Sequence, residues 1–254
     1  MKQSQAKKRD NAMTNKILMG LIALVLGLLF LEILIVHSKN EQQKNASNQV
    51  QTARIMANGD LLYHDGLYMS ALQADGSYDF TENFTYVKPW LKQADLTLGD
   101  FEGTINPDYP LSGYPLFNAP QSVTAAIKDA GYDVMDLAHN HILDSGLEGA
   151  FTTADAFKEV GIDPVGVYEK PVRDKAPLLI KDVNGIKVAI LSYAYGYNGL
   201  ESNLTDKEVA DHLSNLDEKR MKAEIQRAEK EADITVIMPQ MGVEYRLEPT
   251  DEQV

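Results

Sequence analysis

The stretch YDVMDLAHNHILDSG, residues 132–146, places an apolar run directly before two histidines, an asparagine and an aspartate. Residues 133–138 have the length and composition of a buried strand. Proteins with alternating strands and helices carry their chemistry at the carboxyl ends of such strands. The stretch therefore predicts a strand that ends either in a functional site or in a hydrogen-bonded turn.

The same alternation extends over most of the chain from residue 53 onward. Strands are expected at 54–58, 95–98, 133–138, 164–167 and 233–239, and a hairpin is expected to turn at Asn184-Gly185. Helices are expected at 82–93, 122–130, 147–160 and 206–231. The pattern predicts an α/β domain with a largely parallel sheet. Residues 103–120, with four prolines and two glycines, are expected to form an irregular loop.

An apolar segment precedes this domain. Residues 17–36 contain a single charge, Glu32, and at about 1.5 Å per residue they reach roughly 30 Å, the thickness of a bilayer core. Five basic residues and one acid come before the segment, which predicts a cytoplasmic N-terminus at 1–16 and an extracellular C-terminal part. The sequence thus predicts a single transmembrane anchor at 17–36 and a polar stalk at 37–52. A cleaved signal peptide is the alternative.

Charge and cysteine content limit the partners and the chemistry. The chain has 24 basic and 37 acidic residues. The first 36 positions hold 5 of the basic and 2 of the acidic residues, so the rest of the chain has 19 basic and 35 acidic residues. An outer part with a formal charge of −16 repels nucleic acid, and it accepts an anionic polymer only when a cation intervenes. Because the chain has no cysteine, histidine, aspartate, glutamate and asparagine are the strong side-chain ligands left for a metal.

Three predicted strands finish in polar groups. The first ends at Asp60, the second at Asp100 followed by Glu102, and the third at Asn140 and His141. The carboxyl ends of parallel strands share one edge, so these groups are expected to converge. Carboxylate, amide and imidazole ligands suit Mn, Fe or Zn. A Gly-Asp pair taken alone is more typical of a turn or a helix cap, and its repetition at successive strand ends favours a site.

Three further polar residues have two interpretations each. His139 is a candidate catalytic group together with His141, or a residue that supports the site. His64 is an additional ligand or a surface residue. Asp144 either joins the site or closes a turn after the Asn-His pair.

Four motifs together resemble the CapA family of capsule and poly-γ-glutamate synthesis proteins. They are NGD at 58–60, LGDFEGTI at 98–105, HNHILDSGLEGAFTT at 139–153 and MPQMGVEY at 238–245. The family's domain is similar to the calcineurin-like metallophosphoesterases. The resemblance implies a layered α/β sandwich at 53–254 in which Asp60, Asp100, Asn140 and His141 match metal-ligand positions.

The sequence departs from the family pattern in two places. Gln240 stands where many relatives carry histidine, and an amide binds transition metals more weakly and cannot act as an acid or base. Glu244 follows within the same motif and is a further candidate ligand. The sequence also ends at Val254 in what reads as the first turn of a helix, so the domain is expected to be C-terminally incomplete.

The resemblance implies a membrane-anchored, cell-surface protein of capsule or poly-γ-glutamate biosynthesis that depends on divalent metal ions. The expected partners are the plasma membrane, an anionic capsular polymer such as poly-γ-glutamate and membrane-bound synthase subunits, with no nucleic acid. Two functions remain open: a metal-dependent hydrolase that cleaves a phosphoester or the polymer, and a non-catalytic accessory protein that binds or exports the polymer.

Overall fold

The computed structural model describes residues 28, 30–39, 50–243, 245–251 and 253–254, which divide between two compact units, Met1–Val50 and Gln51–Val254. In the first unit, residues 28 and 30–39 are helical. Among the residues that the structure describes, no helix is long and apolar enough to cross a membrane. Most of the predicted span at 17–36, the basic segment 1–16 and most of the predicted stalk lie outside the described residues.

The second unit, called the main domain below, begins with a parallel four-stranded sheet. Its strands are β1 (Ile55–Asp60), β2 (Leu96–Asp100), β3 (Val134–Asp136) and β4 (Asp163–Val165), in the spatial order β1-β2-β3-β4. Each lies close to a predicted strand. The predicted α/β fold with a parallel sheet is therefore confirmed.

A second sheet holds β5 (Leu179–Val183), β6 (Ile186–Ala194) and β7 (Ile234–Gln240) in that order. β5 and β6 form the predicted hairpin, in which Asn184 and Gly185 both have the positive φ that a tight two-residue turn requires. β7 joins β6 in parallel. The strand–helix alternation alone predicts one sheet, whereas the layered α/β sandwich that the resemblance implies agrees with the two sheets of the described residues.

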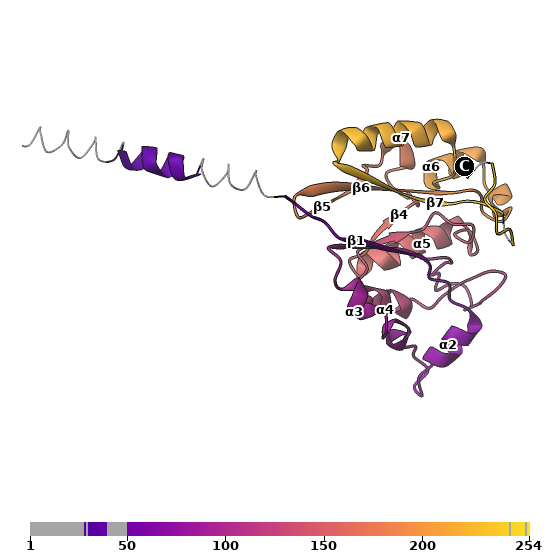
Figure 1. Cartoon of the computed structure of the whole chain (residues 1–254). Helices are drawn as coiled ribbons and strands as arrows, with labels where there is room; N and C mark the ends of the chain where they lie inside the picture. The colour runs from indigo at the N-terminus through magenta and orange to yellow at the C-terminus, as the bar shows by residue number, and fades with distance from the viewer. Residues whose placement is uncertain (1–27, 29, 40–49, 244, 252) are drawn as a thin grey trace, which may run out of the picture. The chain divides into compact units, whose positions relative to one another are not determined.

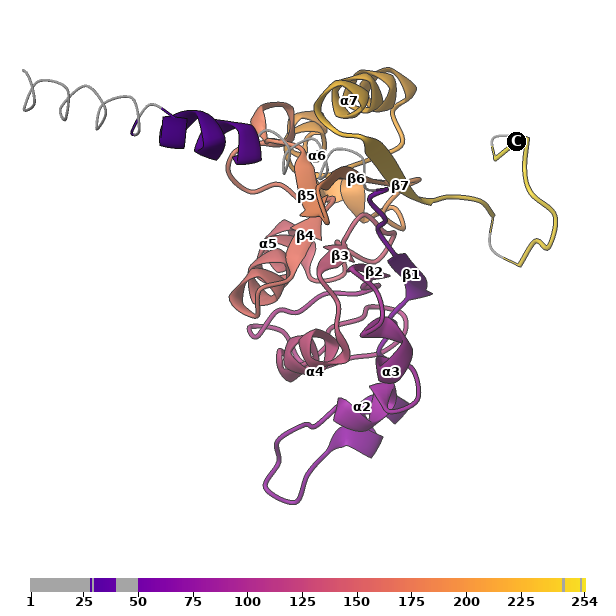
Figure 2. The same ribbon diagram turned by 60° about the vertical axis from the view of Figure 1, so that its left-hand side comes forward.

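The two sheets pack face to face between helices, as Figures 1 and 2 show. The core between them consists of apolar side chains from both sheets: Leu96, Leu98, Val134 and Val165 from the first, and Val183, Val188 and Ile190 from the second. α4 (Ser122–Ala130) and α5 (Gly146–Glu159) cover the other face of the first sheet, and α7 (Glu218–Glu231) covers that of the second. The domain is a four-layer α/β/β/α sandwich.

Short elements fill the connections: α2 (Asp65–Ala71), η1 (Thr81–Phe84), α3 (Lys88–Leu91), η2 (Arg173–Lys175), η3 (Leu200–Asn203) and α6 (Asp206–His212). The helix predicted at 82–93 is divided into η1, a turn and α3. The helix predicted at 206–231 is also divided, because Leu213 and Asn215 form bridges with Val167 and Ala194. Asp217 then caps α7 by accepting a hydrogen bond from the Arg220 N–H at 2.8 Å.

Candidate metal centre

The parallel sheet brings acidic residues together where its strands end. Asp60 pairs in register with Asp100, and Asp100 with Asp136, so β1, β2 and β3 finish at one rim. Gly99 precedes Asp100 at a point where a Cβ atom would lie 2.8 Å from the Tyr132 ring. Only glycine fits there without displacing the ring.

Asp60, Asp100 and Glu102 form a carboxylate cluster. One oxygen from each lies within 4.8 Å of the others, and Asp100 and Glu102 are buried while Asp60 is exposed. Oδ1 of Asp100 is buried with no hydrogen-bond partner in the described part of the chain. A buried oxygen of this kind is costly unless something binds it. Oxygen ligands at this spacing, next to an imidazole, fit a divalent cation.

The electrostatics of the cluster favour the same conclusion. The pKa of Asp100 is raised to about 9 by burial and, secondarily, by the negative charges of Asp136, Asp60 and Glu102. The pKa of Asp136 is raised to about 7 by burial, although hydrogen bonds from the Ser192 hydroxyl and the main chain oppose the shift. A bound cation would offset this accumulated negative charge.

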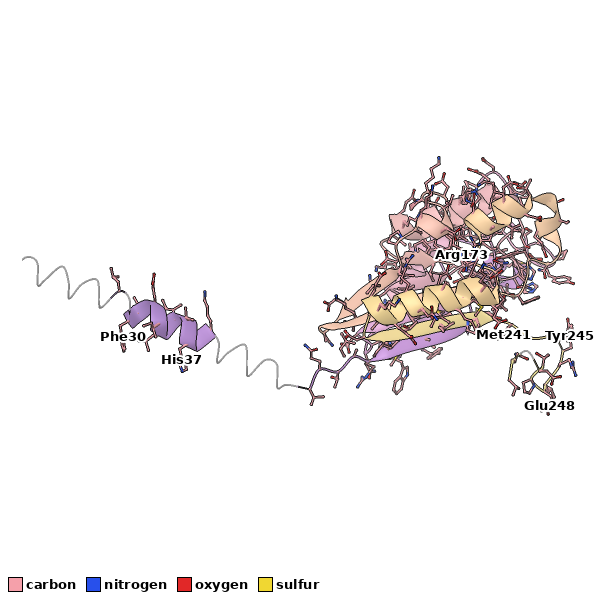
Figure 3. The ribbon with its side chains drawn as sticks, turned by 90° about the horizontal axis from the view of Figure 1, so that it is seen from above. Phe30, His37, Arg173, Met241, Tyr245 and Glu248 are labelled. Atoms are coloured by element: carbon pink, nitrogen blue, oxygen red, sulfur yellow. The ribbon has the colours of Figure 1, made fainter. Side chains whose placement is uncertain are left out.

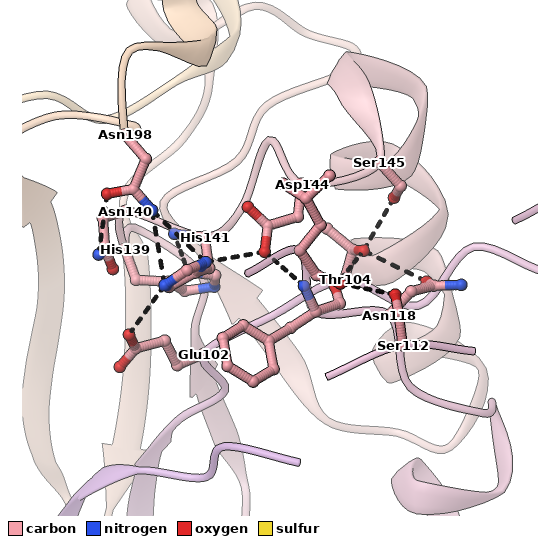
Figure 4. A network of polar contacts seen from close by, with 12 residues as sticks. Glu102, Thr104, Ser112, Asn118, His139, Asn140, His141, Asp144, Ser145 and Asn198 are labelled. Atoms are coloured by element: carbon pink, nitrogen blue, oxygen red, sulfur yellow. Dashed lines mark hydrogen bonds and ion pairs between the residues drawn. The ribbon is translucent and has the colours of Figure 1, made fainter. Parts of the chain in front are cut away.

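His141 lies beside the cluster in a defined orientation. Its Nδ1 is 2.8 Å from Oδ2 of Asp144, and its Nε2 is 3.9 Å from Oε1 of Glu102 (Figure 4). The same Asp144 oxygen accepts a hydrogen bond from the Phe117 N–H at 2.6 Å. A carboxylate on Nδ1 leaves Nε2 as the ligating or proton-carrying atom. Asp144 therefore holds His141 in place from the side opposite the cluster.

Asn140 and Gln240 hold each other through two hydrogen bonds. The Asn140 N–H donates to Oε1 of Gln240 at 2.6 Å, and Nε2 of Gln240 donates to Oδ1 of Asn140 at 3.0 Å. Asn198 accepts a further hydrogen bond from Nδ2 of Asn140 at 3.2 Å and lies close to the His141 ring (Figure 4). Since a carbonyl oxygen has two lone pairs, Asn140 keeps one for a metal.

The other two predicted histidines occupy different environments. His139 is fully buried, and its Nδ1 accepts a hydrogen bond from the His141 N–H at 3.2 Å. Burial, and then the nearby His141, lower the pKa of His139 to about 3, so it stays neutral. His64 is exposed and touches the edge of the Phe117 ring, whose centroid also lies 4.8 Å from that of His141. Phe117 thus contacts both His64 and His141.

A cavity of about 470 Å³ opens at the rim. Its wall includes four residues already described, Asp60, Glu102, Asn140 and Gln240, and also Tyr195. The rest of the wall comes from the segment that follows β7: Met241, Gly242, Val243, Arg246, Leu247, Glu248, Pro249 and Gln253. Figure 3 labels Met241, Tyr245 and Glu248 on this segment. Arg246 adds one cation to a wall that also carries the acids Asp60, Glu102 and Glu248, so a negatively charged ligand would need a bound cation beside it. Glu244 lies outside the described residues.

Three residues that the sequence analysis did not select belong to this region. Asp136 is a buried acid beside Asp100, and its position at a strand end was the available signal. Asn198 comes from the loop after β6 and has the left-handed backbone typical of a tight turn, φ 55°. Phe117 contacts His141 from the irregular loop, and no local sequence pattern identifies it.

Comparison with known proteins identifies the family. Residues 54–254 match the model of the family described as bacterial capsule synthesis protein PGA_cap. The chain belongs to this family. Its predicted place among the CapA proteins is therefore confirmed.

Two similar proteins are both named CapA. The chain is 30% identical over 179 residues to the capsule biosynthesis protein CapA of Bacillus anthracis, a match that covers 67% of this chain and 43% of that protein. It is 25% identical over 249 residues to the PGA biosynthesis protein CapA of Bacillus subtilis, covering 97% and 63%. The chain thus spans about half the length of these relatives.

Among solved structures, a protein assigned as a 5′-nucleotidase from Staphylococcus aureus is similar, with a TM-score of 0.48 and 13% sequence identity. The alignment covers 77% of this chain and 39% of that one.

Proposed function

We propose that this PGA_cap protein binds a divalent cation, Mn, Fe or Zn, at the rim of its parallel sheet and uses it to engage an anionic capsular polymer such as poly-γ-glutamate. The observation that carries the proposal is the cluster of Asp60, Asp100 and Glu102, with His141 beside it. The names of the two CapA relatives supply the polymer class.

Charge explains why a cation is needed. The chain has 37 acidic against 24 basic residues, so a polyanion approaches it against a net repulsion. At the rim, a divalent cation together with Arg246 offsets the charge of Asp60, Glu102 and Glu248 and gives an anionic group a positive centre to bind. The rim thereby becomes the favourable place for a carboxylate or phosphate group.

Metal-dependent hydrolysis is the second candidate function, and the pair of His141 and Asp144 favours it. A divalent cation at this place would lower the pKa of water and offset negative charge that develops on the substrate. The carboxylate of Asp144 at 2.8 Å keeps a proton on Nδ1 of His141, so that Nε2 can ligate the cation or exchange a proton with the substrate. A purely accessory role is favoured by Gln240, which cannot transfer protons and is engaged with Asn140.

The proposed location is the outer face of the plasma membrane, next to membrane-bound synthase subunits. Support comes from the apolar segment 17–36 and the basic residues before it. Protease added to intact cells is expected to remove the main domain and spare the N-terminus. Resistance of the whole chain would contradict this location.

Calorimetric titration of the purified full-length chain with Mn, Zn and Fe(II) tests the function. Asp100→Asn is expected to abolish binding, whereas the matched control Asp155→Asn, a 57% exposed carboxylate on α5, is expected to leave it unchanged. Polymer binding is then measured with metal and with chelator. Metal-dependent turnover that disappears in Asp100→Asn supports the hydrolase, and metal-dependent binding without turnover supports the accessory role. Equal metal binding by the wild type and Asp100→Asn would refute the site.

A further inference from the structure

The short helix α3 and the turn before it expose an unusual set of apolar side chains. Tyr86 is 88% exposed, Trp90 65% and Val87 46%. Leu91 of α3 and Phe84 at the end of η1 are buried in the core, so the segment between them is held at both ends while the aromatic side chains point outward. Large aromatic side chains on a fixed external face indicate an interaction surface.

The charge of this surface differs from that of the rest of the protein. Residues 85–94, TYVKPWLKQA, include Lys88 and Lys92 and no acidic residue, within a chain of net charge −13. Lys88 forms an ion pair with the half-exposed Asp129 of α4, and Lys92 is exposed and also attracts the Asp129 carboxylate. Exposed tryptophan and tyrosine interspersed with lysine are typical of segments at the lipid headgroup level.

The position of the surface in the main domain supports the same partner. The side chain of Arg54, just before β1, donates to the carbonyl of Gln93 at 3.4 Å, and the Asp95 N–H donates to the Arg54 carbonyl at 2.8 Å. The surface therefore lies where the chain enters the domain from residues 51–53. It is also at the amino ends of β1 and β2, opposite the acidic rim.

We propose that Tyr86, Val87 and Trp90, with Lys92, dock the main domain onto an anionic lipid surface. The aromatic side chains insert at the headgroup level, and the lysine attracts anionic lipid. With the amino ends of the strands on the membrane, the rim lies about 20 Å further out, the length of a six-residue strand. The cavity then faces away from the lipid, toward the space where an extracellular polymer would lie. This inference rests on the α3 surface and does not require a metal at the rim.

Trp90 is the single tryptophan of the chain, so its fluorescence reports on this surface directly. The full-length chain is mixed with vesicles of phosphatidylcholine, with or without phosphatidylglycerol, and with lipids brominated on the acyl chains. We expect a blue shift and bromine quenching of Trp90 on anionic vesicles, weaker on neutral ones and reduced by salt. Because the segment 17–36 contains no tryptophan, quenching reports contact of α3 with the lipid whether or not that segment is inserted in the membrane.

Two variant pairs provide controls. Lys92→Gln is expected to weaken docking about five-fold, the effect of one lysine near an anionic surface, whereas Lys170→Gln, which removes an 86% exposed lysine elsewhere, is expected to have no effect. Tyr86→Ala is expected to reduce quenching, and Tyr114→Ala, a 76% exposed tyrosine on the irregular loop, is expected to leave it unchanged. Unquenched Trp90 on anionic vesicles, equal quenching on neutral vesicles, or protection of Trp90 only by a protein partner would each overturn the proposal.

Discussion

Replacing Asp100 by asparagine is expected to have opposite effects on stability in the absence and presence of metal. Without metal, the substitution removes a carboxylate that is buried beside Asp136, Asp60 and Glu102, so the variant should be more stable than the wild type at neutral and alkaline pH. With metal, the substitution removes a ligand, so the variant should gain nothing from the cation. A residue with a purely structural role would not produce this reversal.

The sign of the pH effect follows from the direction of the two shifts. The pKa values of Asp100 and Asp136 in the folded protein, about 9 and about 7, lie above the ordinary aspartate value of 3.8, so the folded state binds protons more tightly than the unfolded state. Their stabilising contribution is complete below about pH 4 and is lost as the pH rises through the two folded-state values. Above about pH 7, the further decrease in the free energy of unfolding comes mainly from the deprotonation of Asp100.

The size of the effect is measurable. Each extra proton bound by the folded state changes the free energy of unfolding by about 1.4 kcal/mol per pH unit, which for a domain of this size shifts Tm by roughly 3–5 °C per pH unit. A cation at about 100 times its Kd adds about 2.7 kcal/mol, or roughly 5–11 °C. The metal effect should grow with pH, because the ligands must be deprotonated.

Thermal melts followed by circular dichroism, from about pH 5 to about pH 9 with chelator or with Mn, test these expectations. The Tm of the metal-free wild type should fall between about pH 7 and about pH 9, whereas the Tm of Asp100→Asn should stay nearly constant over that interval. Asp155→Asn should follow the wild type. A metal-free wild type whose Tm does not change over the interval, or an Asp100→Asn variant that Mn stabilises as much as the wild type, would refute the reasoning.

Three other substitutions test the support of His141 and two packing contacts elsewhere in the main domain. Asp144→Asn should lower metal affinity roughly 10–100-fold in calorimetry, because His141 loses the carboxylate that orients it; unchanged affinity would exclude His141 as a ligand. Glu224→Gln should destabilise the protein by about 3–5 kcal/mol in denaturant titrations, because the buried Arg173 loses its charged partner, and a loss below about 1 kcal/mol would contradict this. Gly166→Ala should cost about 1–3 kcal/mol in the same assay, because φ is +103° and the new Cβ atom would lie 2.7 Å from the nitrogen of Ala138.

Local sequence patterns predicted the elements of the fold better than their assembly. The helix at 122–130 and the hairpin at Asn184-Gly185 depend on local periodicity and turn chemistry, and both are confirmed. The division into two sheets depends on which apolar faces meet, and alternation along one strand carries no such information. The break between α6 and α7 has a similar origin, because the bridges of Leu213 with Val167 and of Asn215 with Ala194, both far away in the sequence, override helix propensity.

The acidic part of the site could be predicted for a topological reason. Asp60, Asp100 and Glu102 follow the ends of parallel strands, so strand order alone brings them to one rim. Asp136 pairs with Asp100 in register, but its apolar neighbours in YDVMDLA make it read as part of a buried strand. Asn198 reaches the site from a loop 58 residues beyond Asn140, and only the packing of the two sheets brings it there.

Gln240 shows how a departure from the family pattern is accommodated in this chain. It ends β7 in the second sheet, while Asn140 follows β3 in the first, so their two hydrogen bonds join the sheets at the rim. The acceptor and the donor of a neutral imidazole point in divergent directions, whereas the C=O and one N–H of an amide point to the same side, which matches the main-chain N–H and side-chain oxygen of Asn140. The glutamine therefore supports Asn140, and the groups left as candidate ligands are the carboxylates of Asp60, Asp100 and Glu102 and the imidazole of His141. With this division of roles a divalent cation would bind against the first sheet, while Gln240 of the second sheet and the segment after β7 line the cavity.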